Sequence, residues 1–575
     1  MRFLARRSVV FVMLTALLLA IVGGQAPGVL AARPTDTRVA GIDVDAATIP
    51  ELQELMDRHR LSSVQLVRFY LHRIKKLNPE LNAVITVAPD AKAQARAADR
   101  ARRQGDDRPL LGIPVIVKDN VNTSDMPTTA GSWSLAGSTP DDAFIVERLR
   151  AAGAIVIAKA NLSEWANFRS SPSSSGWSGI GGQTNMAHVL DRNACGSSSG
   201  TAVAVAADLA TVGIGTETDG SIVCPAGANG IVGIKPTLGL VSREGIIPIS
   251  ADQDTAGPMT RNVTDAAVVL GAITGIDPAD PATAAQAGHA TDDYTAFLDP
   301  DALEGARIGV WRVGTYNPDL SPEIGALLDT VVAELEAAGA TVIDPVAVPV
   351  DEAYGPEFEA LLCEFQDDLP AYFEAYTGAG YPKTLQDVID FNNDHPELEG
   401  PWNSLLFELA AATGGRSDPA CQAARELADE IATASIDDTL AEHDLDAIVG
   451  PTNGPAWVTD PVNGDLGGDF STFVGSSGPA AIAGYPNITV PAGYVGPLPL
   501  GISFMASAWA EPELIALAYA YEQATRVRQP PQFIPSIGAD ATAAERADRG
   551  RGQGQGGDRR ATPNGRGEWR MPPLR

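Results

Sequence analysis

Apolar positions along this chain alternate between helical spacing and short unbroken runs. Val64, Val67, Leu71 and Ile74, for example, recur at the spacing that places side chains on one face of a helix. Unbroken apolar runs of strand length separate such helical segments. Strands that are apolar throughout are typical of sheets covered on both faces. The alternation therefore predicts an α/β fold with a mainly parallel or mixed core sheet.

The same pattern predicts the individual elements. Thr48, followed by Pro50, is typical of a helix start. Helices are predicted from 62 onward and over 48–58, 89–103, 142–152 and 511–525. Strands are predicted over 83–87, 109–117, 154–158, 447–449, 487–490 and 501–504. The segment 279–435 is more acidic and more helical, which predicts a cover over the sheet.

The first 32 residues have the pattern of a secretory signal peptide. Arginines at positions 2, 6 and 7 precede an apolar run over 9–22, and small residues lead to a cleavage site near Ala31 or Ala32. The run is short for a membrane span, although an uncleaved anchor is the alternative. Arg6–Arg7 leaves the twin-arginine route open beside the general one. We expect a secreted or extracytoplasmic protein without a stable membrane anchor.

The other end of the chain is also separable from the body. Residues 541–575 are rich in Gly, Arg, Gln and Pro and contain eight arginines against four acidic residues. We expect a disordered tail over 531–575 and a folded body over 33–530. The whole chain has a net charge of −31, and its basic ends leave the body still more acidic. Such a body repels nucleic acid and acidic membranes, and no obligate protein partner is evident.

Four cysteines and six histidines form no metal-binding motif. Cys363 and Cys421 are candidates for a disulfide in an oxidising compartment, and the sequence leaves their pairing open.

Two glycine-flanked serine clusters lie within 193–225 and bracket the mostly apolar segment 202–214. This order predicts a loop, a short buried helix, a buried strand and a second loop. Glycine lets a backbone approach a substrate closely, so hydroxyls among glycines suit a nucleophile site. Ordinary surface loops are the alternative for such clusters.

Lysine is scarce, with seven residues against thirty-four arginines, and three of the seven lie around the serine clusters: Lys118, Lys159 and Lys235. A buried lysine can lose its proton, whereas an arginine cannot. Lys118 follows the apolar run 109–117 directly, which suits a general base. A structural ion pair is the alternative for each of the three.

Several separated motifs occur in an order that resembles the amidase signature family, over a stretch from about Asp43 to Arg528. They are Gly112-Ile-Pro-Val-Ile-Val-Lys118-Asp-Asn, Gly196-Ser-Ser-Ser-Gly200, Thr218-Asp-Gly-Ser221-Ile, Gly233-Ile-Lys-Pro-Thr237 and Asp254-Thr-Ala-Gly-Pro258. Finer details resemble the bacterial peptide amidases: Asn161-Leu-Ser-Glu-Trp-Ala-Asn-Phe-Arg169, Thr216-Glu-Thr-Asp-Gly-Ser-Ile-Val-Cys-Pro225, Ala483-Gly-Tyr-Pro-Asn487 and Ala518-Tyr-Ala-Tyr-Glu-Gln523.

The resemblance implies one large catalytic domain, with a central mixed sheet covered by helices on both faces, and no cofactor. It implies a Ser–cis-Ser–Lys triad in which Ser221 is the nucleophile, Ser197 the bridging serine after a cis Gly196–Ser197 bond, and Lys118 the base. The substrate would be a small-molecule or short peptide amide. Peptides with a C-terminal amide are expected, and aryl or aliphatic amides are the alternative.

The same resemblance implies an oxyanion hole formed by the backbone N–H groups of Thr218, Asp219, Gly220 and Ser221. Many family members have Asp at the position of Glu217 and Gly at the position of Asp219. The segment 184–190 also departs from the peptide amidase pattern. This departure affects what can be expected of the rim of the substrate entrance and leaves the triad unaffected.

The same residues also allow other functional interpretations. Gly196-Ser-Ser-Ser-Gly200 also fits a nucleophile elbow with Ser198, which requires a buried strand directly before it and a partner such as His443. Polar residues at 191–193 argue against that strand. The intact set of lysine and two serines argues against a silent binding module, and export argues against a tRNA-linked amidotransferase. A cysteine nucleophile is the remaining alternative, but Cys224 lies beyond the oxyanion segment and suits packing better.

Overall fold

The computed structural model describes residues 36–312, 322–465 and 475–537. The expected signal peptide at 1–32 lies outside these residues, and so does the expected tail 531–575 apart from 531–537. In that short part the expectation of disorder is wrong, because Phe533 is buried and its N–H donates to Ala187 O at 3.0 Å. The chain divides into one unit that ends at Pro535 and a second that begins at Ser536. The description below concerns the first unit.

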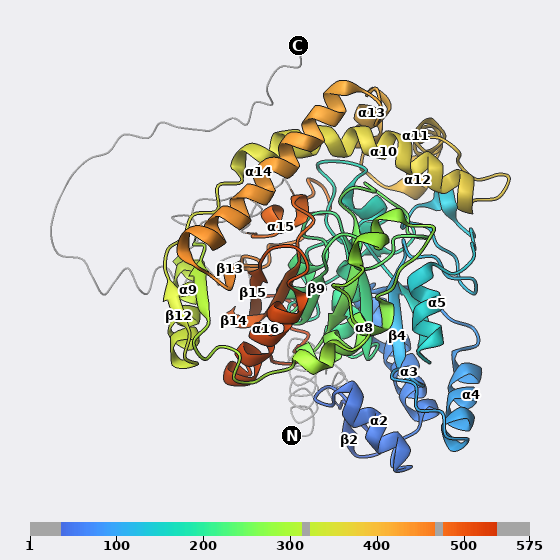
Figure 1. Ribbon diagram of the computed structural model, residues 1–575. Helices are drawn as coiled ribbons and strands as arrows, with labels where there is room; N and C mark the ends of the chain where they lie inside the picture. Colours follow the sequence, from blue (N-terminus) through green and yellow to red (C-terminus); the bar gives the residue numbers. More distant parts are fainter. Residues whose placement is uncertain (1–35, 313–321, 466–474, 538–575) are drawn as a thin grey trace, which may run out of the picture. The chain divides into compact units, whose positions relative to one another are not determined.

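An eleven-stranded mixed sheet forms the centre of this unit within the described residues (Figure 1). In the order in which they lie side by side, the strands are β12 (Thr341–Ile343), β11 (Arg307–Val310), β13 (Ala447–Pro451), β15 (Leu498–Met505), β14 (Asn487–Val495), β9 (Val232–Lys235), β10 (Thr255–Thr260), β8 (Val212–Glu217), β4 (Pro114–Lys118), β5 (Ile155–Ala160) and β3 (Val84–Val87). Strand β4 pairs in parallel with both β5 and β8, whereas β10 is antiparallel to β8 and β9. The side chains at the ends of β4 and β8 therefore meet at one edge of the sheet.

Helices cover both faces of the sheet, as predicted. Helices α6 (Ser199–Ala206) and α7 (Val223–Ala228) pack on one face, and every residue of both is buried. The helices on the other face are α5 (Phe144–Ala151), α8 (Val263–Ile273), α9 (Pro322–Ala337) and α16 (Glu511–Thr525). Helices α8 and α16 lie in front of the sheet in Figure 1.

Capping residues determine where the first helices begin. Helix α2 (Ile49–Asp57) begins with a capping box, in which the Thr48 side chain accepts from the N–H of Glu51 and the Glu51 side chain accepts from the N–H of Thr48. The Ser62 side chain accepts from the N–H of Gln65 at the start of α3 (Ser63–Leu81). Helix α4 (Ala91–Arg103) follows β3. These helices lie where the apolar pattern predicts them.

The remaining elements are short. Two small hairpins pair β1 (Arg38–Val39) with β2 (Ile42–Asp43) and β6 (Trp177–Ser178) with β7 (Gly182–Gln183). Helix α15 spans Gly478–Ile482. The 3-10 turns are η1 (Trp133–Leu135), η2 (Glu164–Asn167), η3 (Pro281–Gln286), η4 (Tyr294–Phe297) and η6 (Asp351–Ala353).

Long helices cover the edge of the sheet that carries Lys118. Helices α10 (Tyr354–Tyr376) and α14 (Pro419–His443) run side by side and are joined by a disulfide between Cys363 and Cys421 (Figure 1). They are accompanied by α11 (Leu385–Asp394), α12 (Pro396–Glu399) and α13 (Leu405–Ala411). Buried aromatic residues of the cover, Phe365, Phe373 and Phe407, pack around Trp165 of the core. The pairing of Cys363 with Cys421, which the sequence left undecided, is therefore present in the structure.

Two expectations about the elements are wrong in part. The segment 279–435 is a helical cover, but it also supplies β11 and β12 at one end of the sheet. These strands have only four and three residues, too few to produce a recognisable apolar run. The run 109–117 is a strand only from Pro114 onward. Leu110, Leu111 and Ile113 are buried within turns, and burial in a turn produces the same apolar pattern as a strand.

Among the residues that the structure describes, we find no helix with both the length and the apolar character needed to span a bilayer.

Two helical glycines provide a matched test of the packing. A Cβ at Gly200 in α6 would lie closer than 3.0 Å to the backbone oxygens of Asn161 and Ala83, whereas a Cβ at Gly325 in α9 would meet nothing within 4 Å. Gly200→Ala should lower stability by about 1–3 kcal/mol or more, because neither backbone oxygen belongs to a side chain that can turn away. Gly325→Ala should raise it by about 0.5–1 kcal/mol through helix propensity. Denaturant unfolding of both variants checks this, and equal effects would contradict the close packing of α6.

Candidate active site

Lys118 is the last residue of β4, and its side chain is fully buried between the end of β8 and the first serine loop. Its Nζ atom lies 2.7 Å from Ser197 Oγ, 2.8 Å from Thr216 Oγ1 and 3.1 Å from Thr216 O. Asn120 also donates to Thr216 Oγ1, at 3.0 Å. The lysine amine is therefore fixed by three oxygens, one of which belongs to a serine hydroxyl.

Burial lowers the pKa of Lys118 from 10.5 to about 7. The carboxyl groups of Asp254 and Glu217 act in the opposite direction, but they do not outweigh the loss of solvent. Near neutral pH a substantial share of the amine is therefore uncharged. An uncharged amine has two N–H donors and one lone pair, so it can donate to both Thr216 oxygens and accept a proton from Ser197.

The other two lysines near the serine loops have different surroundings. Lys159 Nζ lies 3.4 Å from Asp119 Oδ1 and donates to Val121 O and Thr128 Oγ1, both at 2.7 Å. This pairing holds the loop that follows β4. Lys235 donates to Pro236 O at 3.1 Å. Of the three lysines, Lys118 is the one whose amine contacts a serine.

The two serine loops are held together beneath the sheet edge. The Gly196–Ser197 peptide bond is cis, and Ser197 is fully buried. The N–H of Ser198 donates to Ser221 O at 3.1 Å, which joins the first loop to the second. A buried disulfide between Cys195 and Cys224 joins the first loop to α7, the helix that follows the second loop. Cys224 is packed in a buried cluster with Ala228 and Trp457, as expected, and its disulfide is a further feature that the sequence did not indicate. All four cysteines of the chain are in disulfides, which excludes a cysteine nucleophile.

Thr218, Asp219, Gly220 and Ser221 form the turn between β8 and α7. Gly220 has a φ of +75°, a conformation that glycine adopts without strain. In the described structure the N–H groups of Asp219, Gly220 and Ser221 donate to no other group. Ser221 is 7% exposed as a residue, and its hydroxyl likewise has no hydrogen bond among the described residues. The turn thus presents free donors beside a hydroxyl that solvent reaches.

Glu217 fixes this turn from one side. Its Oε2 atom accepts from the N–H groups of Ile222 at 2.7 Å and Val223 at 3.0 Å, at the start of α7. Burial raises the pKa of Glu217 above its ordinary value. The Glu217 carboxylate therefore ties β8 to α7.

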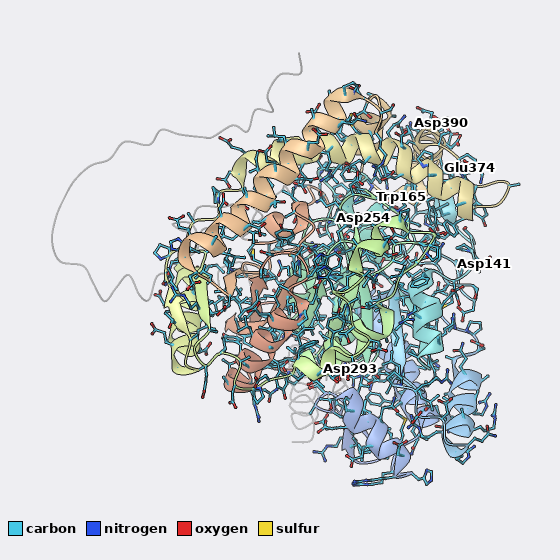
Figure 2. All side chains as sticks on the ribbon, in the orientation of Figure 1. Asp141, Trp165, Asp254, Asp293, Glu374 and Asp390 are labelled. Atoms are coloured by element: carbon cyan, nitrogen blue, oxygen red, sulfur yellow. A yellow bond between two sulfur atoms is a disulfide. The ribbon has the colours of Figure 1, made fainter. Side chains whose placement is uncertain are left out.

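Asp254 is a site residue whose contacts sequence reasoning missed. It is buried, whereas Asp293 and Asp390, which are labelled with it in Figure 2, are exposed. Its Oδ1 accepts from the Thr218 hydroxyl, and its Oδ2 accepts from the N–H groups of Ile249 at 2.8 Å and Ser250 at 3.0 Å. Burial raises the pKa of Asp254 to about 6. The motif that contains Asp254 was recognisable, but nothing in it indicated a contact with Thr218.

A cavity of about 470 Å³ adjoins the site. At one end it is lined by Asn120, Thr216 and Thr218, which contact the Lys118 network or belong to the turn. An apolar wall runs over 246–249, and α10 contributes Tyr372 and Tyr376. The lining also includes six charged residues: Arg243, Glu244, Asp252, Asp254, Asp280 and Asp368. A cavity that combines an apolar wall with polar groups is typical of small-molecule and peptide sites.

The structure does not support the nucleophile elbow. Ser198 Oγ donates to Thr216 O at 3.0 Å and accepts from Thr216 N–H at 3.2 Å, so this hydroxyl ties the loop to β8. Between β7 and α6 the described backbone forms isolated bridges rather than a strand. His443 is the last residue of α14, where its carbonyl accepts from Arg307 at 2.9 Å.

Comparisons with known proteins agree over most of the chain. Residues 65–515, which include Lys118, Ser197 and Ser221, match a family model described as Amidase. A probable amidase from Arabidopsis thaliana is 41% identical over 506 residues, covering 85% of this chain and 92% of the relative. A solved structure of the native peptide amidase from Stenotrophomonas maltophilia is 49% identical with a TM-score of 0.80, and covers 85% of this chain and 99% of that one. The peptide amidase PAM in complex with the competitive inhibitor chymostatin is 50% identical with a TM-score of 0.81 and the same coverage.

Proposed function

The chain belongs to the amidase family and is a hydrolase of amide bonds, and we propose that Lys118, Ser197 and Ser221 carry out this hydrolysis as a triad. The observation that carries the proposal is the fully buried Lys118 amine, with its pKa lowered to about 7, at 2.7 Å from Ser197 Oγ.

In the proposed reaction, uncharged Lys118 accepts the proton of Ser197, which accepts the proton of Ser221. The Ser221 oxygen then attacks the carbonyl carbon, and the carbonyl oxygen becomes negatively charged. The free N–H groups of Asp219, Gly220 and Ser221, together with that of Thr218, are suited to stabilise this charge. The relay requires the Ser221 hydroxyl to turn toward Ser197.

The return of the proton through the same groups converts the leaving nitrogen to ammonia. The C–N bond breaks and leaves an ester between the acyl group and Ser221. Water, deprotonated through the same relay, attacks this ester and releases the carboxylic acid. Reactants and products balance as amide plus water to acid plus ammonia, and the reaction uses no cofactor.

The proposed substrates are short peptides that end in a carboxamide. Two solved structures at 49–50% identity are of peptide amidase, and the cavity of about 470 Å³ has room for the side chain next to the scissile amide. Its apolar wall over 246–249 and its two tyrosines suit an apolar or aromatic side chain. Aryl or aliphatic amides are the alternative within the same family.

We also propose that the protein is exported. The arginines, apolar run and small residues within 1–32 support a cleaved signal peptide. Two disulfides, Cys195–Cys224 and Cys363–Cys421, suit an oxidising compartment.

The triad predicts both a mutational and a pH signature. Ser221→Ala should lower kcat by about 10³-fold or more, and so should Lys118→Met, which removes the base while keeping side-chain length. For the wild type, kcat/KM should be constant above pH 7 and fall about tenfold per pH unit below it, because protonation removes the base.

Ser198→Ala is the matched serine control. It removes a hydroxyl that binds the backbone of Thr216 but does not belong to the proposed proton relay. It should lose stability yet keep measurable turnover. Initial rates of ammonia release over pH 5–9, with circular dichroism of each variant, supply the measurement. Full turnover by Lys118→Met, or an inactive Ser198→Ala beside an active Ser221→Ala, would contradict the triad.

The substrate proposal is tested by measuring ammonia release from amidated dipeptides and aliphatic amides, and aniline release from anilides. We expect kcat/KM for a dipeptide amide with an apolar C-terminal residue to exceed that for acetamide by at least about tenfold, because contacts with the cavity wall add binding. The same dipeptides as free acids are the blank. Highest kcat/KM on anilides would favour the aryl amide alternative.

Export is tested by expressing the full chain in a bacterial host and sequencing the N-terminus of protein from the culture medium and periplasm. We expect a new N-terminus close to residue 33, and cytoplasmic protein that still begins at Met1 would contradict export.

A further inference from the structure

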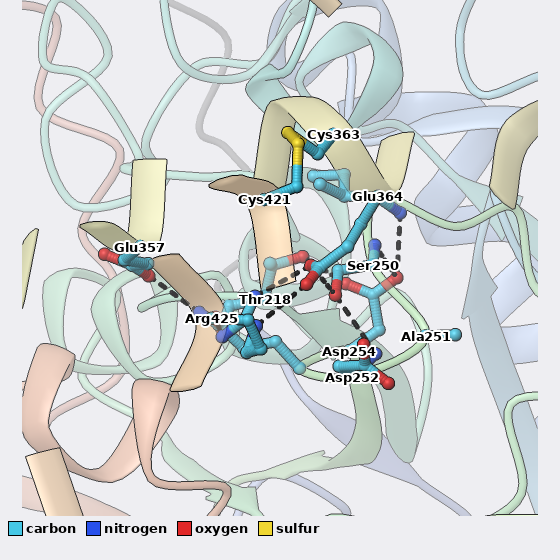
Figure 3. Close-up of polar contacts among 12 residues, drawn as sticks. Thr218, Ser250, Ala251, Asp252, Asp254, Glu357, Cys363, Glu364, Cys421 and Arg425 are labelled. Atoms are coloured by element: carbon cyan, nitrogen blue, oxygen red, sulfur yellow. Dashed lines mark hydrogen bonds and ion pairs between the residues drawn. A yellow bond between two sulfur atoms is a disulfide. The ribbon is translucent and has the colours of Figure 1, made fainter. Parts of the chain in front are cut away.

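A chain of buried polar contacts links the cover helices to the turn that carries the proposed oxyanion donors (Figure 3). It begins at Glu364 on α10, whose carboxylate accepts from Arg425 Nε at 2.8 Å and Nη2 at 2.7 Å. Arg425 comes from α14, so this bidentate pair joins the two helices. The same carboxylate accepts from the Ser250 hydroxyl at 2.6 Å.

The first branch of this network reaches the side chain of Thr218. Ser250 donates its backbone N–H to Asp254 Oδ2 at 3.0 Å, and Asp254 Oδ1 accepts from the Thr218 hydroxyl. The loop 249–254 thus lies between the Glu364–Arg425 pair and Thr218.

The second branch reaches the backbone of Thr218. Arg425 Nη1 donates to Gln253 Oε1 at 2.9 Å, and Gln253 Nε2 donates to Thr218 O at 3.0 Å. Gln253 Nε2 also donates to Glu357 Oε1 at 2.7 Å, so α10 fixes the amide a second time. Both the oxygen and the nitrogen of the Gln253 side chain are therefore hydrogen-bonded.

The bond to Thr218 O has a geometric consequence for the next residue. A trans peptide unit is planar, and its C=O and N–H point in opposite directions. A donor that fixes the carbonyl of Thr218 therefore also fixes the direction of the N–H of Asp219, which is one of the free donors of the turn.

The network is shielded from solvent. Gln253 is fully buried, and Glu364, Arg425 and Asp254 are each less than 9% exposed. In such surroundings hydrogen bonds to charged groups are strong, and the loss of one partner leaves the other unpaired. Cys363 precedes Glu364 directly, and its disulfide with Cys421 fixes the spacing of α10 and α14 at this level.

We propose that Glu364, Arg425 and Gln253 are positioning residues, which aim the N–H of Asp219 at the carbonyl oxygen of the substrate. The inference rests on the proposed role of the turn 218–221. Through these residues the cover controls the rate of the chemical step as well as the shape of the cavity. None of the three lines the cavity of about 470 Å³, and their contacts reach the site through Thr218.

The test compares Gln253→Glu, which keeps size but removes the donor to Thr218, with Glu364→Gln, which weakens the pair with Arg425. We expect kcat to fall about 10- to 100-fold with little change in KM, somewhat less than the roughly 10²–10³-fold cost of removing an oxyanion donor outright. Glu359→Gln is the matched control, since it makes the same change at an exposed position of α10. It should leave kcat unchanged.

The inhibition constant Ki of a peptide aldehyde distinguishes a positioning role from a merely structural one. The adduct of the aldehyde with the nucleophile carries an oxygen in the position of the oxyanion, so its Ki should rise in proportion to the loss of kcat/KM. The Ki of the product acid should stay within about twofold of the wild type. Ser250→Ala, which cuts the first branch alone, should give a smaller loss than Gln253→Glu.

Variants that lower only the melting temperature, or that raise KM and the product Ki while kcat is kept, would overturn the inference. If Glu364→Gln does not fold, Gln253→Glu and Ser250→Ala decide the question. Wild-type turnover on the amide panel tests the proposed function separately. The ratio of variant to wild type tests the positioning role, so the two failures are distinguishable.

Discussion

The burial of one amine is the interaction on which the rest of this site depends. Lys118 has no exposed surface, and loss of solvent lowers its pKa to about 7 although two carboxyl groups lie near enough to oppose the change. An exposed lysine at the same distance from Ser197 would remain charged at neutral pH and could accept no proton. The sheet provides this burial, because β5 and β8 flank β4 on both sides and α6 covers its face.

The serine loops are held to that amine by several independent ties. The Ser198 hydroxyl binds both backbone groups of Thr216, and the Ser198 N–H donates to Ser221 O. The Cys195–Cys224 disulfide joins the first loop covalently to α7, which follows the second loop. Gly200 allows α6 to approach the backbone at Asn161 so closely that no side chain fits between them. Packing and polar contacts therefore define the same position for both loops.

The cover contributes to the site in two ways. Its tyrosines line the cavity, and its Glu364–Arg425 pair reaches the turn 218–221 through the loop 249–254. A second ion-pair group, Arg416 with Asp368 and Asp252, joins the cover to the same loop near the surface. Helix α10 thus contributes both to the wall of the cavity and, together with α14, to the contacts that hold the turn 218–221.

The sequence by itself determined the local elements, the α/β class and the residues expected at the site. Caps at Thr48 and Ser62 act within four residues, and apolar runs record burial directly, so both can be read from neighbouring positions. The resemblance of separated motifs identified the amidase family and, with it, Lys118, Ser197 and Ser221 as candidates. The geometry at Lys118 and Ser197 is compatible with that expectation, and the catalytic roles await the mutational test.

Only the tertiary structure decided which distant residues meet. The sheet brings β11 and β12 to its end although neither has enough residues to show a pattern. The contacts of Asp254 with Thr218 and of Glu364 with Ser250 join residues 36 and 114 positions apart. Such contacts depend on the path of the whole chain, whereas a sequence pattern reports only the environment of each position. For the same physical reason the Cys195–Cys224 disulfide was not foreseen: its formation requires the two serine loops to be adjacent, and adjacency is a property of the fold.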